Sequence, residues 1–489
     1  MKRIAVAVAA LLAATPLCAG SVAVVQHAAI ATSSPQATRI GLSVLERGGN
    51  AIDAAVATAL ALGHIGGGGF LVYYDAATRS VWTLDFQEVA PLAATRDRFG
   101  KALPHDGAIS AAVPGTVAGL AAMYERFGSM TWRDLVAPAA LLARDQKNTD
   151  LAATLDRIAD KGAGDFYDGE IASRIVEGAR AGGGILSLRD LREYKPVWRA
   201  PMKVTEREFD IYTLPPPSAA GLMISEELTI LSGFDLKSGS AATMHLMAEA
   251  ARRAAIDRDR YVGDPTTQRT PYRELLSAER VKQWRASIDP LRATPTISLT
   301  NAPVAAASPH TTHFSIVDAH GNIAAVTTSL GDENGSGFVA PHCGFVLNNS
   351  MKDFATKEPS PNLVSPGNRM ATSDAPMIIL RRGEPYLVLG SSGGPAIPNI
   401  LLQIFFNVAF FGTSLPDAVA APRFDQQANP DDISYEYLKM PAAVVARLRA
   451  MGHGMREVES IGDVEALMIE TRRITAVSDP RHGGAAGGY

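Results

Sequence analysis

Residues 309–330 of this chain read Pro-His-Thr-Thr-His-Phe-Ser-Ile-Val-Asp-Ala-His-Gly-Asn-Ile-Ala-Ala-Val-Thr-Thr-Ser-Leu. From residue 311 to residue 318 the side chains alternate as they do in a strand, which places Phe314 and Ile316 on one face and Val317 on the other. Residues 319–322 supply turn chemistry, and residues 323–330 read as a second strand. The stretch therefore predicts a β-hairpin.

The predicted pairing of these two strands brings hydroxyl groups together. If Asp318 pairs with Ile323, then Thr311 lies opposite Leu330 and beside Ser329. By itself this arrangement is consistent with an ordinary threonine-rich hairpin, because β-branched residues favour strands in general. The hairpin alone therefore predicts structure rather than chemistry.

The wider sequence is similar to one protein family. Thr311–Asp318, Gly321–Thr327 and Leu347–Phe354 together resemble the γ-glutamyltranspeptidases. These are N-terminal nucleophile hydrolases, made as one chain that cuts itself immediately before the first threonine of the motif. The resemblance implies an α+β fold, a four-layer αββα sandwich, and a cut between His310 and Thr311. Further matching segments are Gly48–Ala55, Gly66–Phe70 and Ser478–Arg481.

Length and composition are those of a large globular protein. The 489 residues are 47% hydrophobic and 20% charged, which allows a sizeable core in two lobes or one large layered domain. A net charge of −4 without blocks of like charge gives no indication of a nucleic-acid partner. The sequence has no Walker loop, dinucleotide fingerprint or metal-ligand motif, so we expect neither a cofactor nor a metal.

The first 19 residues predict a signal peptide. Two basic residues precede an apolar run, Ile4–Leu12, and the small residues near Ala19 suit a signal peptidase. The run is too short for a stable membrane anchor, so we expect a periplasmic or secreted protein. Removal of this segment leaves Cys343 as the single cysteine, and no disulfide then forms within the mature chain.

The predicted cut divides the chain into two subunits. Residues 20–310 are the expected large subunit, mostly helical, and residues 311–489 are the expected small subunit with the nucleophile at its start. Residues 285–310 are rich in proline and read as an exposed linker, where a chain cut is accessible. Residues 131–260 read as mostly helical, and the four glycines Gly66–Gly69 are consistent with a tight turn of positive φ. Other predicted elements are helices at 37–47, 51–62 and 395–411 and strands at 70–74, 377–380 and 386–389.

The chemistry of the predicted site starts from a weak nucleophile. A threonine hydroxyl needs an adjacent base, and as the first residue of a chain Thr311 has an α-amine whose free pKa of about 8 suits that role. The same hydroxyl attacks the carbonyl of His310 to make the cut. By the resemblance, Ser329 replaces a threonine that hydrogen-bonds the nucleophile, and Gly393 and Gly394 form the oxyanion hole ahead of a helix.

The resemblance also implies a pocket for a γ-glutamyl group, with departures from the family pattern. Asp353 matches the aspartate that binds the substrate ammonium, and Thr372 with Ser373 matches the serine pair that binds its carboxylate. Three positions depart from the pattern: Gln87 replaces the arginine that binds the carboxylate, and Gly331 and Ser350 replace polar residues on the ammonium side. Loss of an arginine contact to a desolvated carboxylate weakens binding strongly.

These residues predict a self-processing amidohydrolase that cuts γ-glutamyl amides such as glutathione and favours hydrolysis over transfer. The main alternative is an acylase of the same family acting on glutaryl or cephalosporin-type amides, and a processed protein that only binds its ligand is a further one. Gly390–Gly394 also fits G-x-S-x-G, with Ser392 as the nucleophile of an α/β-hydrolase and Asp425 or Asp463 and then His482 as its partners. The chain lacks the regular strand–helix alternation that this last fold needs.

Overall fold

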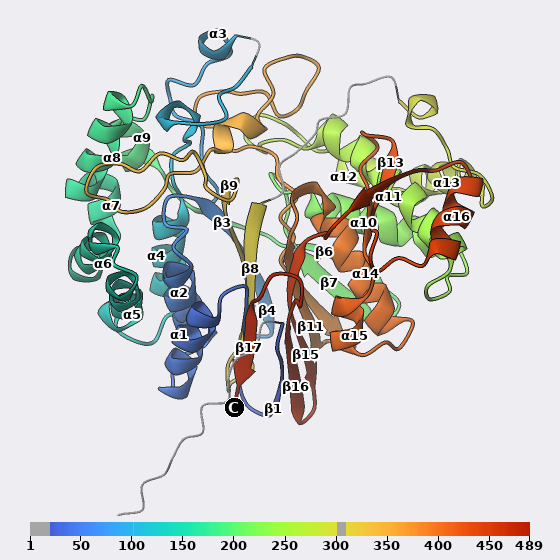
Figure 1. Ribbon diagram of the computed structural model, residues 1–489, viewed down its shortest axis with the longest axis horizontal. Helices are drawn as coiled ribbons and strands as arrows, with labels where there is room; N and C mark the ends of the chain where they lie inside the picture. The colour runs from blue at the N-terminus through green and yellow to red at the C-terminus, as the bar shows by residue number, and fades with distance from the viewer. Residues whose placement is uncertain (1–19, 101, 301–309) are drawn as a thin grey trace, which may run out of the picture.

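A computed structural model describes residues 20–100, 102–300 and 310–489. The predicted signal peptide at 1–19 and the linker residues 301–309 lie outside the described residues. Figure 1 shows a layer of helices, two sheets face to face, and a second layer of helices. This arrangement confirms the predicted α+β fold, a four-layer αββα sandwich.

Two seven-stranded antiparallel sheets form the middle of the described part of the chain. The first, here called the nucleophile sheet, runs in the order β17 (Ala485–Gly488), β2 (Ala29–Thr32), β8 (His310–Val317), β9 (Ile323–Gly331), β3 (Gly68–Asp75), β4 (Ser80–Asp85) and β5 (Val197–Arg199). The second, here called the facing sheet, runs in the order β1 (Val22–Val25), β16 (Arg473–Ser478), β15 (Asp463–Glu470), β11 (Glu384–Ser392), β10 (Met377–Arg381), β7 (Phe209–Thr213) and β6 (Met202–Glu206). A small separate sheet contains β12 (Phe424–Gln426), β13 (Asp432–Glu436) and β14 (Gly454–Val458).

Helices cover the outer face of each large sheet (Figure 1). Those on the nucleophile sheet are α1 (Pro35–Glu46), α2 (Ala51–Leu62), α4 (Thr116–Phe127), α5 (Trp132–Asp145), α6 (Thr149–Lys161), α7 (Gly164–Asp168), α8 (Glu170–Ala181) and α9 (Leu188–Glu193). Those on the side of the facing sheet are α10 (Ala220–Leu231), α11 (Ala241–Tyr261), α12 (Tyr272–Leu275), α13 (Ala278–Ala286), α14 (Ile397–Ala409), α15 (Leu415–Ala420) and α16 (Ala442–Ala450). The remaining short elements are α3 (Arg96–Phe99), η1 (Ala108–Ser110), η2 (Thr296–Ser298), η3 (Ser350–Asp353) and η4 (Gly394–Ala396).

The alternation of β8 separates two apolar cores. Phe314 and Ile316 are fully buried in the core shared with α2, while Val317 is buried in the core between the two sheets. Helix α2 begins at a capping box, because the Oδ1 atom of Asn50 accepts the N–H groups of Ile52 and Asp53, both at 2.9 Å. The predicted faces of the first hairpin strand are thus confirmed.

The register of the β8–β9 hairpin differs from the prediction by one residue. Val317, not Asp318, pairs with Ile323, because Asp318 closes the turn: its N–H donates to the carbonyl of Asn322 at 3.0 Å. Near the other end Thr312 pairs with Thr328, but His310 pairs with Gly331. One residue of β8 therefore faces two residues of β9, which is a β-bulge. Thr311 lies opposite Ser329 and Leu330 together.

The four glycines at 66–69 do not form a turn of positive φ, so that prediction is wrong. Glycine is needed at residues 67 and 69 because the backbone there lies close to the backbone of β9. A Cβ atom on Gly67 would lie 1.9 Å from the carbonyl oxygen of Ser329, and one on Gly69 would lie 2.1 Å from that of Thr327. The start of β3 can therefore pack against β9 only without side chains.

The prediction that residues 131–260 are mostly helical is wrong between residues 197 and 213. Strands β5, β6 and β7 lie there and extend one edge of each large sheet. They are three to five residues long and only partly buried along much of their length, so their alternating pattern is short and weak.

We predict that Gly67→Ala prevents correct folding or lowers stability by roughly 3 kcal/mol or more, because the new methyl group must displace the backbone of β9. Gly164→Ala is the matched control, because its Cβ meets nothing within 4 Å. Thermal unfolding and soluble yield of the two variants test this. Equal stability of both variants would contradict the close-approach argument.

Candidate active site

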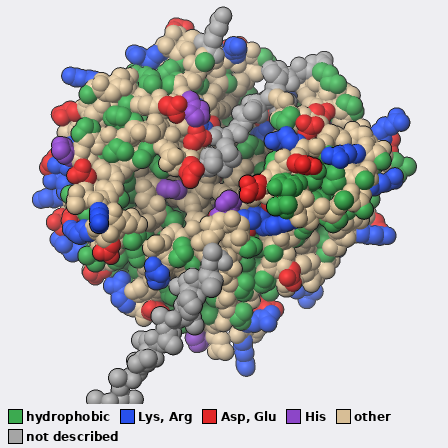
Figure 2. All heavy atoms as spheres, in the orientation of Figure 1, with side chains coloured by type: hydrophobic (Ala, Val, Ile, Leu, Met, Phe, Trp, Pro, Cys, Tyr) green, Lys and Arg blue, Asp and Glu red, His purple; other side chains and the backbone are tan. Residues whose placement is uncertain are grey.

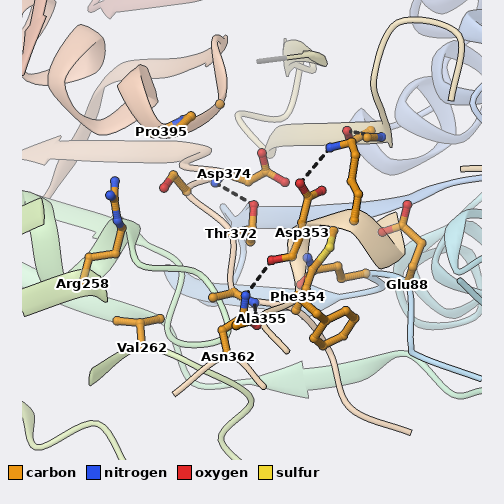
Figure 3. A pocket seen from close by; sticks show the side chains of 18 of the residues that line it. Glu88, Arg258, Val262, Asp353, Phe354, Ala355, Asn362, Thr372, Asp374 and Pro395 are labelled. Atoms are coloured by element: carbon orange, nitrogen blue, oxygen red, sulfur yellow. Dashed lines mark hydrogen bonds and ion pairs between the residues drawn. The ribbon is translucent and has the colours of Figure 1, made fainter. Parts of the chain in front are cut away.

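Most of the predicted site residues line one cavity of about 190 Å³. Its wall combines the ends of strands from the nucleophile sheet with loops that follow η3 and precede β10 and α14 (Figure 3). The predicted residues that line it are Thr311, Ser329, Gly331, Gln87, Asp353, Thr372, Ser373 and Gly394. Gly393 borders a neighbouring cavity, and Ser350 is buried beside the cavity residue Glu88 without lining the cavity itself.

Thr311 lies at the bulge of β8 and is half-buried. Besides the main cavity it borders a second cavity of about 270 Å³, so its side chain is reachable from two sides. Ser329 faces it across the bulge, and the Ser329 Oγ atom accepts the N–H of Gly331 at 2.9 Å. The structure thus places the predicted nucleophile and its predicted hydroxyl partner on the same cavity wall.

The predicted oxyanion glycines occupy the step between β11 and α14. Gly393 has φ +126° and Gly394 has φ +55°, conformations that other residues rarely adopt. The predicted helix at 395–411 is confirmed in its main part by α14, after the short turn η4. Gly394 lines the cavity with Thr311, which suits a backbone N–H aimed at the reacting carbonyl.

Asp353 already has a cationic partner. The Nζ atom of Lys352 lies 2.7 Å from Asp353 Oδ1 and 3.5 Å from Asp332 Oδ1. Burial raises the pKa of Asp353, and the charge of Lys352 opposes this. The position predicted to bind a substrate ammonium therefore holds the ammonium of the chain's own lysine (Figure 3). No sequence pattern predicts this pairing, because adjacent Lys and Asp residues normally point into solvent.

Gln87 is buried at the cavity wall, and its side-chain amide forms no hydrogen bond with the described residues. Its side chain is 2% exposed, and neither Oε1 nor Nε2 has a hydrogen-bond partner among the described residues. The nearby arginine Arg369 does not replace the missing one, because it binds Asp85 at 3.2 Å and the carbonyl of Lys195 at 2.8 Å. The buried carboxyl group of Glu88, next to Ser350, has its pKa raised by burial to about 8.

Gly331 contributes no side chain and has no room for one. Its φ is +89°, and a Cβ atom would lie 2.1 Å from Asn349 Oδ1. That oxygen accepts the N–H of Asp332 at 3.0 Å, while the Asn349 amide donates to Asp332 Oδ2 at 2.7 Å. The ammonium side of the cavity is therefore shaped by Asn349 and Asp332 rather than by residue 331.

Asp374 is a cavity residue that the sequence reasoning missed. It follows the predicted pair Thr372–Ser373 and is 6% exposed. Burial raises its pKa to about 7, while hydrogen bonds from the hydroxyls of Thr372 and Thr311 favour the carboxylate. The signal available in the sequence was an acidic residue between a cavity motif and the buried strand β10.

The loop at Pro215–Ser218 holds this segment in place. The Ser218 hydroxyl donates to the carbonyl of Asp374 at 2.7 Å, and the N–H of Thr372 donates to the carbonyl of Pro217 at 3.1 Å. The N–H of Asp374 donates to the Thr372 hydroxyl at 3.2 Å (Figure 3). Both ends of the short segment are thus fixed by hydrogen bonds.

The alternative site at Ser392 does not fit the α/β-hydrolase fold. Ser392 ends β11, whose neighbours in the facing sheet are both antiparallel, whereas a nucleophile elbow follows a strand of a parallel sheet. Ser392, Asp463 and His482 border the second cavity, but no hydrogen bond joins them in the described part of the chain. Asp425 lies elsewhere and binds Gln427 at 2.8 Å. This alternative is wrong.

One group of described residues has the composition of a metal site. Ligand atoms of His245, Glu249 and His453 lie within 4.8 Å of one another. His245 Nε2 donates to the carbonyl of Asp289 at 2.8 Å, so His245 Nδ1 accepts from His453 Nε2 at 2.7 Å. Two arginines, Arg252 and Arg253, bind Glu249. A metal ion would have to displace these bonds, although His453 Nδ1 has no hydrogen-bond partner among the described residues.

Comparison with known proteins decides the family. The family model described as gamma-glutamyltranspeptidase matches residues 37–145 and 146–489. The chain is 34% identical to a glutathione hydrolase proenzyme of Pseudomonas aeruginosa, over 93% of each chain. It is 33% identical to one of Escherichia coli K12, over 92% of this chain and 90% of that protein. The chain belongs to the γ-glutamyltranspeptidase family.

Membership of this hydrolase and transferase family makes the chain an enzyme. Its fold is also that of a solved cephalosporin acylase from Bacillus halodurans, with a TM-score of 0.85 and 24% identity over 96% of this chain and 97% of that one. Among the described residues, no helix is both long and apolar enough to cross a membrane. On the face shown in Figure 2, acidic and basic side chains are interspersed without a large area of one sign.

We predict that Lys352→Met increases the preference for a γ-glutamyl anilide over a glutaryl anilide about fivefold or more. These substrates differ by one ammonium group, and removal of the lysine frees Asp353 to bind it. Asp353→Ala should abolish the preference. The measurement is the ratio of the two kcat/KM values.

Lys357→Met on the same segment is the matched control, because Lys357 is exposed and outside the cavity wall. An unchanged ratio in both Lys352→Met and Asp353→Ala would remove the Lys352–Asp353 pair from the substrate site.

Proposed function

We propose that the chain is a self-processing amidohydrolase that cuts γ-glutamyl amides such as glutathione through an acyl-Thr311 intermediate. The observation that carries the proposal is the place of Thr311: it is the second residue of β8, an inner strand of the nucleophile sheet, and it borders the cavity. A cut before Thr311 separates only the first residue from this strand and makes Thr311 a chain start.

The reaction follows from the groups around Thr311. The free α-amine accepts the hydroxyl proton as the Oγ atom attacks the substrate carbonyl carbon, and the leaving amine takes that proton as the amide bond breaks. The backbone N–H groups at Gly393 and Gly394 stabilise the oxyanion, and Ser329 orients the nucleophile. Water then opens the ester. We favour hydrolysis over transfer, because water needs no binding site of its own whereas an acceptor does.

The mature protein is proposed to contain two chains from one precursor, residues 20–310 and 311–489. Two of the relatives reported above are named proenzymes, which supports this organisation. Export through the predicted signal peptide would place the enzyme in the periplasm or outside the cell. The linker at 285–310, exposed over much of its described part, supports a cut at its end.

A second candidate is an acylase of the same family acting on amides without the γ-glutamyl group. Gln87 offers no charge to a substrate carboxylate, and the two cations that line the cavity are engaged: Lys352 by Asp353, and Arg258 by Asp259 at 2.6 Å. A substrate carboxylate bound at this wall of the cavity would also face the acidic groups of Glu88 and Asp374. This observation favours an acyl group that carries no carboxylate at this wall.

We predict that Thr311→Ala gives one uncut chain without amidase activity, because both the nucleophile and the cutting residue are lost. Wild-type protein should give two chains, and N-terminal sequencing of the smaller should read Thr-Thr-His-Phe. Ser392→Ala is the control and should be cut and active. Full activity of Thr311→Ala together with an inactive Ser392→Ala would contradict the assignment.

We predict that Gln87→Arg raises kcat/KM for a γ-glutamyl anilide about tenfold or more, since roughly 1.4 kcal/mol of added binding is tenfold. The physical reason is that arginine supplies a charged planar fork where glutamine supplies two neutral N–H donors. If the cavity is shaped for another acyl group, the arginine becomes an unpaired buried charge and activity falls. A fall, or no change, would favour the acylase.

A further inference from the structure

We propose that Asp374 is the base of self-cleavage: its carboxylate accepts the proton of the Thr311 hydroxyl before the α-amine exists. The inference rests on the self-processing proposed above and adds a catalytic residue to it. It concerns the cut between residues 310 and 311, not the later turnover of substrate.

The need for such a base follows from the covalent state of the uncut chain. The nitrogen of Thr311 is then part of a peptide bond, and an amide nitrogen does not accept a proton at neutral pH. A threonine hydroxyl is nevertheless a weak nucleophile without a base. The α-amine that acts as the base after the cut is therefore not available as a base for the cut itself.

Asp374 meets the geometric requirement. It lines the main cavity with Thr311, and the Thr311 hydroxyl is one of two hydroxyls close enough to its carboxyl group to lower its pKa. The Ser218 hydroxyl donates to its carbonyl and its N–H donates to the Thr372 hydroxyl, so its backbone is held in place beside the cavity. At 6% exposure the group is shielded from bulk water, where hydration would weaken it as a base.

The histidines near the hairpin are poorly placed for this role. Both ring nitrogens of His313 are engaged, one with Thr327 at 2.9 Å and one with Ser315 at 3.0 Å. His64 faces the hydroxyl of Thr328 rather than that of Thr311. They therefore hold the hairpin together and leave the proton of Thr311 to another group.

Several other acids border the two cavities beside Thr311, and Asp353 and Asp463 are two of them. Asp353 is held by Lys352, which lowers its basicity. Asp463 borders the second cavity, where its pKa is raised by burial to about 7, and its Oδ1 atom has no hydrogen-bond partner among the described residues. Of these three, Asp374 is the acid whose pKa the Thr311 hydroxyl lowers. Asp463 is the natural comparison in an experiment.

The electrostatic surroundings of Asp374 place its pKa near neutral pH, so the carboxyl group is about half ionised there. Burial and the carboxyl group of Asp353 raise its pKa, the hydroxyls of Thr311 and Thr372 lower it, and the result is about 7. Glu88, Lys352 and Arg258 are further charged or titratable groups on the same cavity wall. A carboxyl group of this pKa can both accept and return a proton at neutral pH.

The steps balance with no added reactant except water. The Asp374 carboxylate takes the hydroxyl proton while Thr311 Oγ bonds to the carbonyl carbon of His310. The bond from that carbon to the nitrogen of Thr311 breaks, and Asp374 returns the proton to this nitrogen. The product is an ester between residues 310 and 311 with a free amine on Thr311. Water then hydrolyses the ester and leaves a carboxylate on His310.

The test measures cutting of full-length precursor made by cell-free translation, sampled over time between pH 5 and pH 8. Wild-type cutting should rise about tenfold per pH unit below about pH 7 and level off above it, because the base must be ionised. Asp374→Asn, which keeps the shape but cannot accept the proton, should slow cutting about a hundredfold or more and lose the rise. Thermal unfolding of each precursor checks that it is folded.

Asp463→Asn is the matched control, because it removes a buried carboxyl group of similar pKa from the other side of Thr311, and it should cut like wild type. Loss of the rise in Asp463→Asn, or normal cutting by Asp374→Asn, overturns the inference. A wild-type cutting rate that does not rise with pH also overturns the inference, and this result does not depend on whether a variant folds. Cutting of Thr311→Ala would instead contradict the proposed self-processing itself, which keeps the two failures distinguishable.

Discussion

The break in the ladder between β8 and β9 is the constraint on which the site depends. A regular antiparallel pair would set Thr311 against a single partner. The bulge instead sets it against Ser329 and Leu330 and places Ser329 beside it on the cavity wall. The bulge is tolerated because Gly331 adopts a positive φ and because Gly67 and Gly69 let β3 approach β9 without side chains. The close packing of β3 on β9 thus stabilises the bulge between β8 and β9.

The same packing concentrates carboxyl groups in a space with little water. Glu88, Asp353 and Asp374 reach one cavity from three separate segments of the chain. Burial alone would make all of them neutral, but each meets a different surrounding: Lys352 beside Asp353, Ser350 beside Glu88, and two threonine hydroxyls beside Asp374. Three residues of similar chemistry therefore lie in three different electrostatic surroundings.

The sequence predicted the layers and most of the residues on the cavity wall, because these depend on local alternation and on short motifs that resemble a family. It failed where distant segments meet. The register of the hairpin depended on the backbone N–H of Asp318 closing the turn, and the role of Gly67 and Gly69 depended on β9 lying against them. Gln87, Asp353 and Asp374 reach one cavity from segments far apart in the chain, and no pattern within one segment reveals that they meet.

Self-cleavage and catalysis make opposite demands on the carboxyl group beside Thr311. During the cut an ionised carboxylate helps, since it removes the hydroxyl proton. After the cut the same negative charge lies near the new α-amine, and an opposite charge stabilises the protonated amine, which is no base. A carboxyl group that was always ionised would therefore hinder turnover. Burial limits this conflict, because a pKa of about 7 leaves the group partly neutral at the pH where the amine has to act. One buried acid can thus assist the first reaction without blocking the second.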